Sequence, residues 1–248
     1  MLFDRLVESI INGDAGSSNG IAFRKDSQGN DIGVCIGVHH GKTPTLSDKL
    51  LTRIKNIKGL VGGYSEGVGR DPIQPILNAL GLKEVGNWDT RIEKVGKGAK
   101  NPNYNTVYTF MAFDTKGNPN NIENFNGTTI EDAIRKYPGA RGAGINMDNA
   151  IKDIKAAGFG EQLSMPFSSQ LLKDLFTKLQ DSVYPPPTYR LNIDSFFGQK
   201  MHALELERNE SLYQCMNRGV AFAGAGHLDE LEEQFPDTIE LLDKDRTI

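Results

Sequence analysis

The chain has 248 residues, of which 38% are hydrophobic and 24% are charged, an ordinary balance for a globular protein. Its 28 Lys and Arg residues are scattered among 32 Asp and Glu residues, and the net charge is −4. The sequence therefore lacks the basic patch that binding to nucleic acid requires. No run approaches the roughly 18 apolar residues of a membrane-spanning helix.

The start of the chain, MLFDRLVESIIN, mixes Asp, Arg and Glu with Leu and Ile at helical spacing. This pattern predicts an amphipathic helix and no secretory signal peptide. We therefore expect a cytoplasmic protein or a domain of a larger exported protein. Cys35 and Cys215 lie within apolar patterns, so both are expected to be reduced and buried, with a disulfide as the alternative.

Three segments repeat one pattern, in which a short apolar strand is followed by a break with glycine and then by a helix. The strands are predicted at residues 33–38, 59–64 and 219–223, with a last strand at 238–242. Thr45 and Asp71 are the predicted N-caps of the first two helices, and the third helix is expected to begin near Leu228. Strands that alternate with helices through short loops predict an α/β fold with a mixed, largely parallel sheet flanked by helices.

The middle of the chain has a different composition. Residues 96–128 are crowded with Gly, Asn and Pro around one predicted strand at 107–113. Helices are predicted to follow at 129–136, 146–157 and 168–182. We interpret residues 86–190 as a mainly helical insertion or cap over the sheet, within a single α/β domain of residues 1–248.

Three polar residues stand just past the carboxyl ends of predicted strands: His40, Glu66 and His227. Parallel α/β sheets bind ligands at that edge, because neighbouring strands deliver their loops there. Each histidine ends a Gly-x-x-His, and glycine lets the backbone turn sharply beside a substrate or ion. Two His and one Glu match the ligands of a catalytic zinc site. They also suit a metal-free site, with one histidine as general base and Glu66 setting its tautomer and charge.

The predicted helix at residues 194–219 places Arg208 on its apolar stripe, one turn after Leu204. An arginine that points inward needs a carboxylate or a substrate anion, because burying an unpaired charge costs several kcal/mol. Glu66 and Glu207 are the candidate partners. In the alternative interpretation, the stem of Arg208 runs along the edge of the core and its charged head stays in water.

Three other residues are candidates for supporting roles. Tyr64 and Ser65 precede Glu66 and are candidates to hydrogen-bond a substrate, with packing as the alternative for the tyrosine. Trp88 is expected to anchor the insertion, and a platform for substrate is the alternative.

The stretch ELERNESLYQCMNRGVAFAGAGHLDEL resembles the C-terminal signature of the TraB/GumN group, a helix with Glu-Arg-Asn and then a strand ending in Gly-Ala-x-His-Leu. GVHHGKTPTL is similar to the Gly-Ser/Thr-x-His turn of that group, and LVGGYSEG to its strand that ends in a functional glutamate. The wider superfamily includes the Tiki proteases, the erythromycin esterases and the haem-uptake ChaN proteins. The resemblance covers residues 30–70 and 194–245.

The resemblance implies an α/β fold and, in several branches, hydrolysis. It makes His40 and His227 metal ligands or a general base, and Glu66 a ligand or the partner of the base. Arg208 and Asn209 would support the site. Tiki members are metal-dependent peptidases, and the esterases open a lactone by attack of water. We therefore expect a hydrolase that cleaves an amide or ester bond in a small molecule or peptide, with Mn, Co or Zn where a metal is used.

A second hypothesis is a non-catalytic binding or toxin-associated module that keeps the fold. Val38 favours it, because the group has Ser, Thr or Glu at that position. Haem is a weaker candidate as its ligand, since the matched motifs offer neither Tyr nor Met as an obvious axial ligand. No feature of the sequence predicts an oligomeric state.

Overall fold

The computed structural model describes residues 20–38, 44, 46–66, 73–89, 128–136, 147–188, 190–224 and 226–242. The chain forms two compact units, one of Met1–Glu93 with Leu206–Ile248 and the other of Lys94–Glu205. Three predicted features lie outside the described residues: the helix at the start of the chain, the strand at 107–113, and His40. The interpretation of residues 86–190 as an insertion within one domain stays a prediction.

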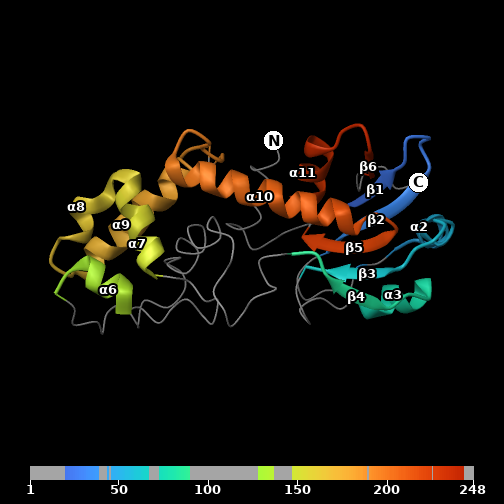
Figure 1. Cartoon of the computed structure of the whole chain (residues 1–248), viewed down its shortest axis with the longest axis horizontal. Helices are drawn as coiled ribbons and strands as arrows, with labels where there is room; N and C mark the ends of the chain where they lie inside the picture. The colour runs from blue at the N-terminus through green and yellow to red at the C-terminus, as the bar shows by residue number, and fades with distance from the viewer. Residues whose placement is uncertain are drawn as a thin grey trace. The chain divides into compact units, whose positions relative to one another are not determined.

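The first unit is built on a six-stranded sheet with the strand order β4-β3-β5-β2-β1-β6 (Figure 1). The strands are β1 (Ile21–Lys25), β2 (Asp31–Val38), β3 (Gly62–Ser65), β4 (Glu84–Asn87), β5 (Gly219–Gly224) and β6 (Ile239–Leu242). The strands from β4 to β2 are parallel, whereas β1 pairs antiparallel with both β2 and β6. The prediction of an α/β fold with a mixed, largely parallel sheet is confirmed.

Helices cover both faces of this sheet. They are α2 (Asp48–Lys55), α3 (Gln74–Leu80), α10 (Phe196–Cys215) and α11 (Gly226–Gln234). One apolar core lies between the sheet and α2 and α3, and the other lies between the sheet and the C-terminal part of α10 together with α11. Alternation along the strands divides the side chains between the two cores, so that Phe23 belongs to the first and Ala22 to the second.

Two helices of this unit begin later than predicted. Ser47 is the N-cap of α2, because its hydroxyl accepts a hydrogen bond from the Leu50 backbone N–H, so the prediction of Thr45 as the cap was wrong. The next helix, α3, begins at Gln74 without a side-chain cap and has Pro75 in its first turn, where the fixed φ of proline suits a helix. The predicted start at Asp71 was therefore wrong.

The C-terminal end of α10 lies against the sheet at Gly33. A Cβ added to Gly33 would lie 1.5 Å from the backbone oxygen of Met216, so no side chain fits there. The Arg218 N–H, just after the helix, donates to the Ile32 carbonyl at 2.9 Å. The backbone of β2 and the end of α10 are thus in direct contact, and this contact fixes the position of the helix that carries Arg208.

Helices make up the described part of the second unit. They are α6 (Ile130–Lys136), α7 (Met147–Ile154), α8 (Gly160–Leu163), α9 (Ser169–Val183) and a π-helical turn, η1 (Lys155–Phe159). Their buried apolar side chains form one core with the start of α10. The prediction of a helical middle region is confirmed. None of the helices in the described ranges is long and apolar enough to cross a membrane.

The contact at Gly33 gives a test of the fold. Gly33→Ala is expected to lower the free energy of unfolding by about 3 kcal/mol or more, because the clash is with backbone that cannot move aside. Gly86→Ala in β4 is the matched control, since its Cβ would meet only Tyr64 ring carbons at 3.7 and 3.8 Å. Urea denaturation of both variants measures the difference, and equal stabilities would contradict the described packing of α10.

Candidate functional site

The carboxyl ends of β3 and β5 bring two of the predicted site residues together. Glu66 directly follows β3, and His227 lies in the first turn of α11, just after β5. These strands are parallel neighbours, so their ends meet at one edge of the sheet. The Nε2 atom of His227 lies 3.9 Å from Oε1 of Glu66. His40, the third member of the predicted set, lies outside the described residues.

Both oxygens of Glu66 accept hydrogen bonds from N–H groups. Oε1 lies 3.1 Å from a guanidinium nitrogen of Arg208, and Oε2 accepts from the backbone N–H of Gly224 at 2.9 Å. Arg208 therefore points inward, as predicted, and Glu66 is its partner. Glu207, the other candidate partner, is exposed.

A second carboxylate that the sequence did not single out also faces Arg208. Oδ2 of Asp89 lies 3.4 Å from the guanidinium of Arg208, and Asp89 is fully buried. Asp89 stands just past β4, as Glu66 stands just past β3. Arg208 thus lies between carboxylates from two neighbouring strand ends. This compensates the cost of burying its charge.

The other ring nitrogen of His227 faces two oxygen atoms. Nδ1 lies 3.2 Å from Oε2 of Glu230 and 3.3 Å from Oδ1 of Asn209. The amide nitrogen of Asn209 donates to Glu230, which orients the amide with its oxygen toward the imidazole. Because carboxylate and carbonyl oxygens only accept, the neutral ring carries its proton on Nδ1 and has its lone pair on Nε2. Asn209 thus lies beside the imidazole, and Glu230, not Glu66, faces the nitrogen that sets the tautomer.

Glu230 is the second site residue that sequence reasoning missed. Burial by itself raises the pKa of its carboxyl, but the hydrogen bond and charge of His227, with Asn209 and Arg208, outweigh burial and lower the pKa. The spacing of three residues places His227 and Glu230 on one face of α11. That spacing is the signal in the sequence that could have identified Glu230.

Trp88 contacts the imidazole from the side. The ring centroids of Trp88 and His227 are 5.3 Å apart at an angle of 79°. Trp88 is fully buried in the core between the sheet, α10 and α11, so it belongs to the sheet unit. The expectation that it anchors the insertion stays a prediction, and its indole lies against the imidazole of His227.

Two side chains supply hydrogen bonds that β3 cannot provide. The pairing of β3 with β5 extends to Tyr64 and Ala221, and β5 continues beyond it to Gly224. Past that point the indole N–H of Trp88 donates to the Phe222 carbonyl at 2.7 Å, and Glu66 accepts from the Gly224 N–H. The end of β5 is therefore held by residues of the candidate site.

The remaining predicted residues have structural partners. Ser65 is buried, and its hydroxyl donates to Glu84. Tyr64 packs against the core that contains Trp88. Neither residue has a described contact with the imidazole of His227.

Two residues of the sheet unit offer donors for a metal ion. A ligand atom of His227 and one of Glu230 lie within 4.8 Å of each other. This pair contains His227 from the predicted metal set but not Glu66.

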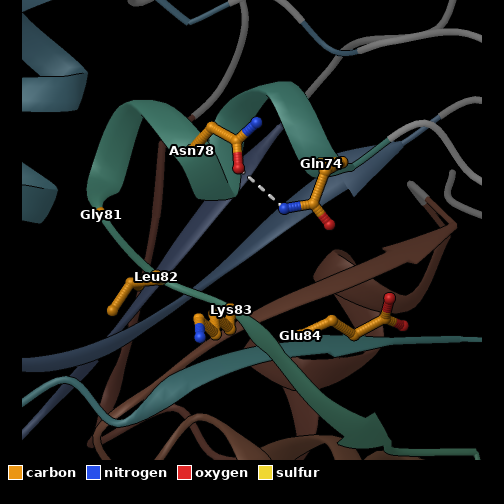
Figure 2. A pocket seen from close by; sticks show the side chains of 6 residues that line it. All are labelled: Gln74, Asn78, Gly81, Leu82, Lys83 and Glu84. Atoms are coloured by element: carbon orange, nitrogen blue, oxygen red, sulfur yellow. Dashed lines mark hydrogen bonds between the residues drawn. The ribbon is translucent and has the colours of Figure 1, made fainter.

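An open pocket of about 700 Å³ lies elsewhere in the sheet unit, between α3 and β4. Figure 2 shows the residues that line it, with the amide of Gln74 donating to Asn78. Its lining is Gln74, Asn78, Gly81, Leu82, Lys83 and Glu84. No predicted site residue is part of this lining, so the pocket is not the site at the ends of β3 and β5.

No protein-family model, curated protein or solved structure matches the chain. The resemblance to the TraB/GumN group stays a prediction based on the motifs.

The pair of Arg208 and Asp89 gives a test of the buried charges. Asp89→Asn is expected to lower the free energy of unfolding by about 2 kcal/mol, because a charged contact at a buried position becomes a neutral one. Glu240→Gln is the control, since Glu240 pairs with Lys25 and Arg53 while 42% exposed and is expected to contribute at most about 1 kcal/mol. Urea denaturation measures both, and equal losses would contradict the buried pair.

Glu230 gives a test that depends on pH. Its pKa lies below the ordinary value of 4.5, so its contribution to stability is present above pH 4.5 and is lost as the pH falls through the folded-state pKa. The stability difference between wild type and Glu230→Gln is expected to be about 1 kcal/mol at neutral pH and to shrink in acid. Urea denaturation across the pH range measures it, with Glu233→Gln in the same helix as control. A difference that grows in acid would contradict the described contacts.

Proposed function

We propose that the chain is a hydrolase in which the imidazole of His227 takes a proton from water beside the carboxylate of Glu66. The observation that carries the proposal is the pair of oxygen acceptors at Nδ1, 3.2 Å away on Glu230 and 3.3 Å away on Asn209. These acceptors keep the proton of the neutral ring on Nδ1 and leave a lone pair on Nε2. An imidazole oriented by a carboxylate in this way is suited to act as a general base.

The proposed reaction is the hydrolysis of an ester or amide in a small molecule or peptide. Nε2 of His227 takes one proton from water as the water oxygen bonds to the carbonyl carbon. The imidazolium then returns this proton to the departing alkoxide or amine nitrogen as the carbon–oxygen or carbon–nitrogen bond breaks. The products are a carboxylic acid and an alcohol or amine, and the ring is neutral again.

In this mechanism Glu66 is a fixed negative charge. Its Oε1 lies 3.9 Å from Nε2 of His227, and both of its oxygens are held by N–H donors from Arg208 and Gly224. A carboxylate in this place stabilises the positive ring that forms when the proton is taken. Arg208 and Asp89 hold Glu66 in position and make no contact of their own with the imidazole in the proposal.

The metal-dependent form of the proposal keeps His227 from the expected set of His40, Glu66 and His227 and leaves out Glu66. Glu66 fits a cation poorly, because the guanidinium of Arg208 is 3.1 Å from one oxygen and repels a second positive charge. His227 and Glu230 fit better, since an imidazole and a neighbouring carboxylate suit Zn, Mn or Co. A divalent ion held there would supply Lewis-acid chemistry and lower the pKa of its bound water.

His227→Gln tests the proposal. The variant is expected to hydrolyse p-nitrophenyl esters or fluorogenic peptide amides at least about 100-fold more slowly than wild type, because it lacks the general base. His202→Gln is the matched control, since His202 is an exposed histidine of α10. Metal analysis of the purified wild type, His227→Gln and Glu230→Gln proteins, with and without chelator, separates the two forms of the mechanism.

The outcomes are distinct. Equal activity in His227→Gln and wild type would remove His227 from the reaction. A wild type that hydrolyses neither class of substrate would contradict the proposal and favour the non-catalytic binding module. Stoichiometric metal that is lost in both variants would support the metal-dependent form, and activity that survives chelation would support the metal-free form.

A further inference from the structure

We infer that Trp88 is a positioning residue that fixes the plane of the His227 imidazole. The contact itself is independent of the proposed function, and its catalytic consequence rests on that function. Trp88 is fully buried and meets the imidazole at a near-perpendicular 79°, with ring centroids 5.3 Å apart. This edge contact is one of the preferred arrangements of aromatic rings.

Trp88 is itself held by three hydrogen bonds to different elements, one through its indole and two through its backbone. Its Nε1–H donates to the Phe222 carbonyl of β5 at 2.7 Å, and the backbone N–H of Trp88 donates to the Ser65 carbonyl of β3 at 3.0 Å. The hydroxyl of Ser211 in α10 donates to the Trp88 carbonyl. The same three elements hold Glu66, Gly224 and Arg208, so Trp88 is fixed in the frame that positions the other site residues.

The imidazole needs this contact because its acceptors restrain only one end of the ring. Hydrogen bonds from Nδ1 to Glu230 and Asn209 leave the ring free to tilt about the direction of those bonds, because hydrogen-bond directions at oxygen are broad. A buried indole packed nearly perpendicular to the ring opposes that tilt. The guanidinium of Arg208 lies 5.7 Å from the centroid of the same indole. Trp88 therefore restrains the directions of both the base and the arginine that holds Glu66.

The chain offers a direct measurement, because Trp88 is its only tryptophan. The indole N–H gives a single side-chain signal in a ¹H–¹⁵N correlation spectrum of the whole protein. His227→Gln is expected to shift this signal, since it removes the ring that contacts the indole. The control variant His202→Gln is expected to leave it in place. An indole signal that is unchanged in His227→Gln would overturn the inference.

A second measurement reports the effect of Trp88 on the imidazole. Long-range ¹H–¹⁵N spectra of histidine-labelled protein distinguish protonation on Nδ1 from protonation on Nε2. Wild type and Trp88→Phe, which keeps an aromatic edge, are expected to show the Nδ1–H form for His227. Trp88→Leu is expected to move toward the Nε2–H form that free histidine favours. A folded Trp88→Leu protein with wild-type ring nitrogens would overturn the inference, and if this variant does not fold, the indole signal in His227→Gln decides.

Kinetics separate this inference from the proposed function. Where hydrolysis is observed, Trp88→Leu is expected to lower kcat about tenfold or more with little change in KM, and Trp88→Phe is expected to recover most of the rate. No hydrolysis in a wild type that shows the Nδ1–H form, together with loss of that form in Trp88→Leu, would contradict the proposed function and support the positioning role. Hydrolysis that is equally fast in Trp88→Leu would overturn the positioning role alone.

Discussion

The unequal lengths of β3 and β5 determine the site. Because β5 extends beyond the end of its neighbour, the Phe222 carbonyl and the Gly224 N–H need partners that a strand no longer supplies. Trp88 donates to the first and Glu66 accepts from the second. The fold thus requires an indole donor and a carboxylate acceptor at this edge. These two side chains are also the ones that meet the imidazole of His227 and the guanidinium of Arg208.

The electrostatics of the site follow from the burial of one charged side chain of α10, the guanidinium of Arg208. Arg208 is only 5% exposed, and a guanidinium at that depth is tolerated because carboxylates face it from two strand ends. Arg208 in turn restrains Glu66, while Asn209, the next residue of α10, restrains the imidazole of His227. One helix therefore fixes both halves of the site. Its own position depends on the close contact of its end with Gly33.

The sequence predicted the parts of the site that repeat a pattern. The periodicity of the sequence alone places Glu66 and His227 just past the ends of strands. It also places Arg208 on the apolar stripe of a helix. Glu230 lies in the acidic run DELEEQ, where composition does not distinguish the one carboxylate that faces inward. Asp89 was missed because β4 is a short, exposed edge strand, EVGN, without the apolar run that marks β3 and β5. Glu66 was a predicted partner of Arg208, and the spacing of three residues from His227 points to Glu230, but Asp89 became visible only when tertiary packing placed it.

The first glycines of the two Gly-x-x-His turns, Gly37 and Gly224, have different roles. A Cβ on Gly37 would lie 2.9 Å from a Leu228 methyl carbon and 3.0 Å from the Gly20 carbonyl oxygen, so packing requires glycine there. A Cβ on Gly224 would make ordinary contacts, at 3.6 Å with Glu66 and 3.9 Å with His227. What the site takes from Gly224 is its backbone N–H, which any residue except proline would supply. In the second turn, a spacing of three residues separates the Gly224 N–H that holds Glu66 from His227. This spacing is therefore what brings Glu66 and His227 to the same edge of the sheet.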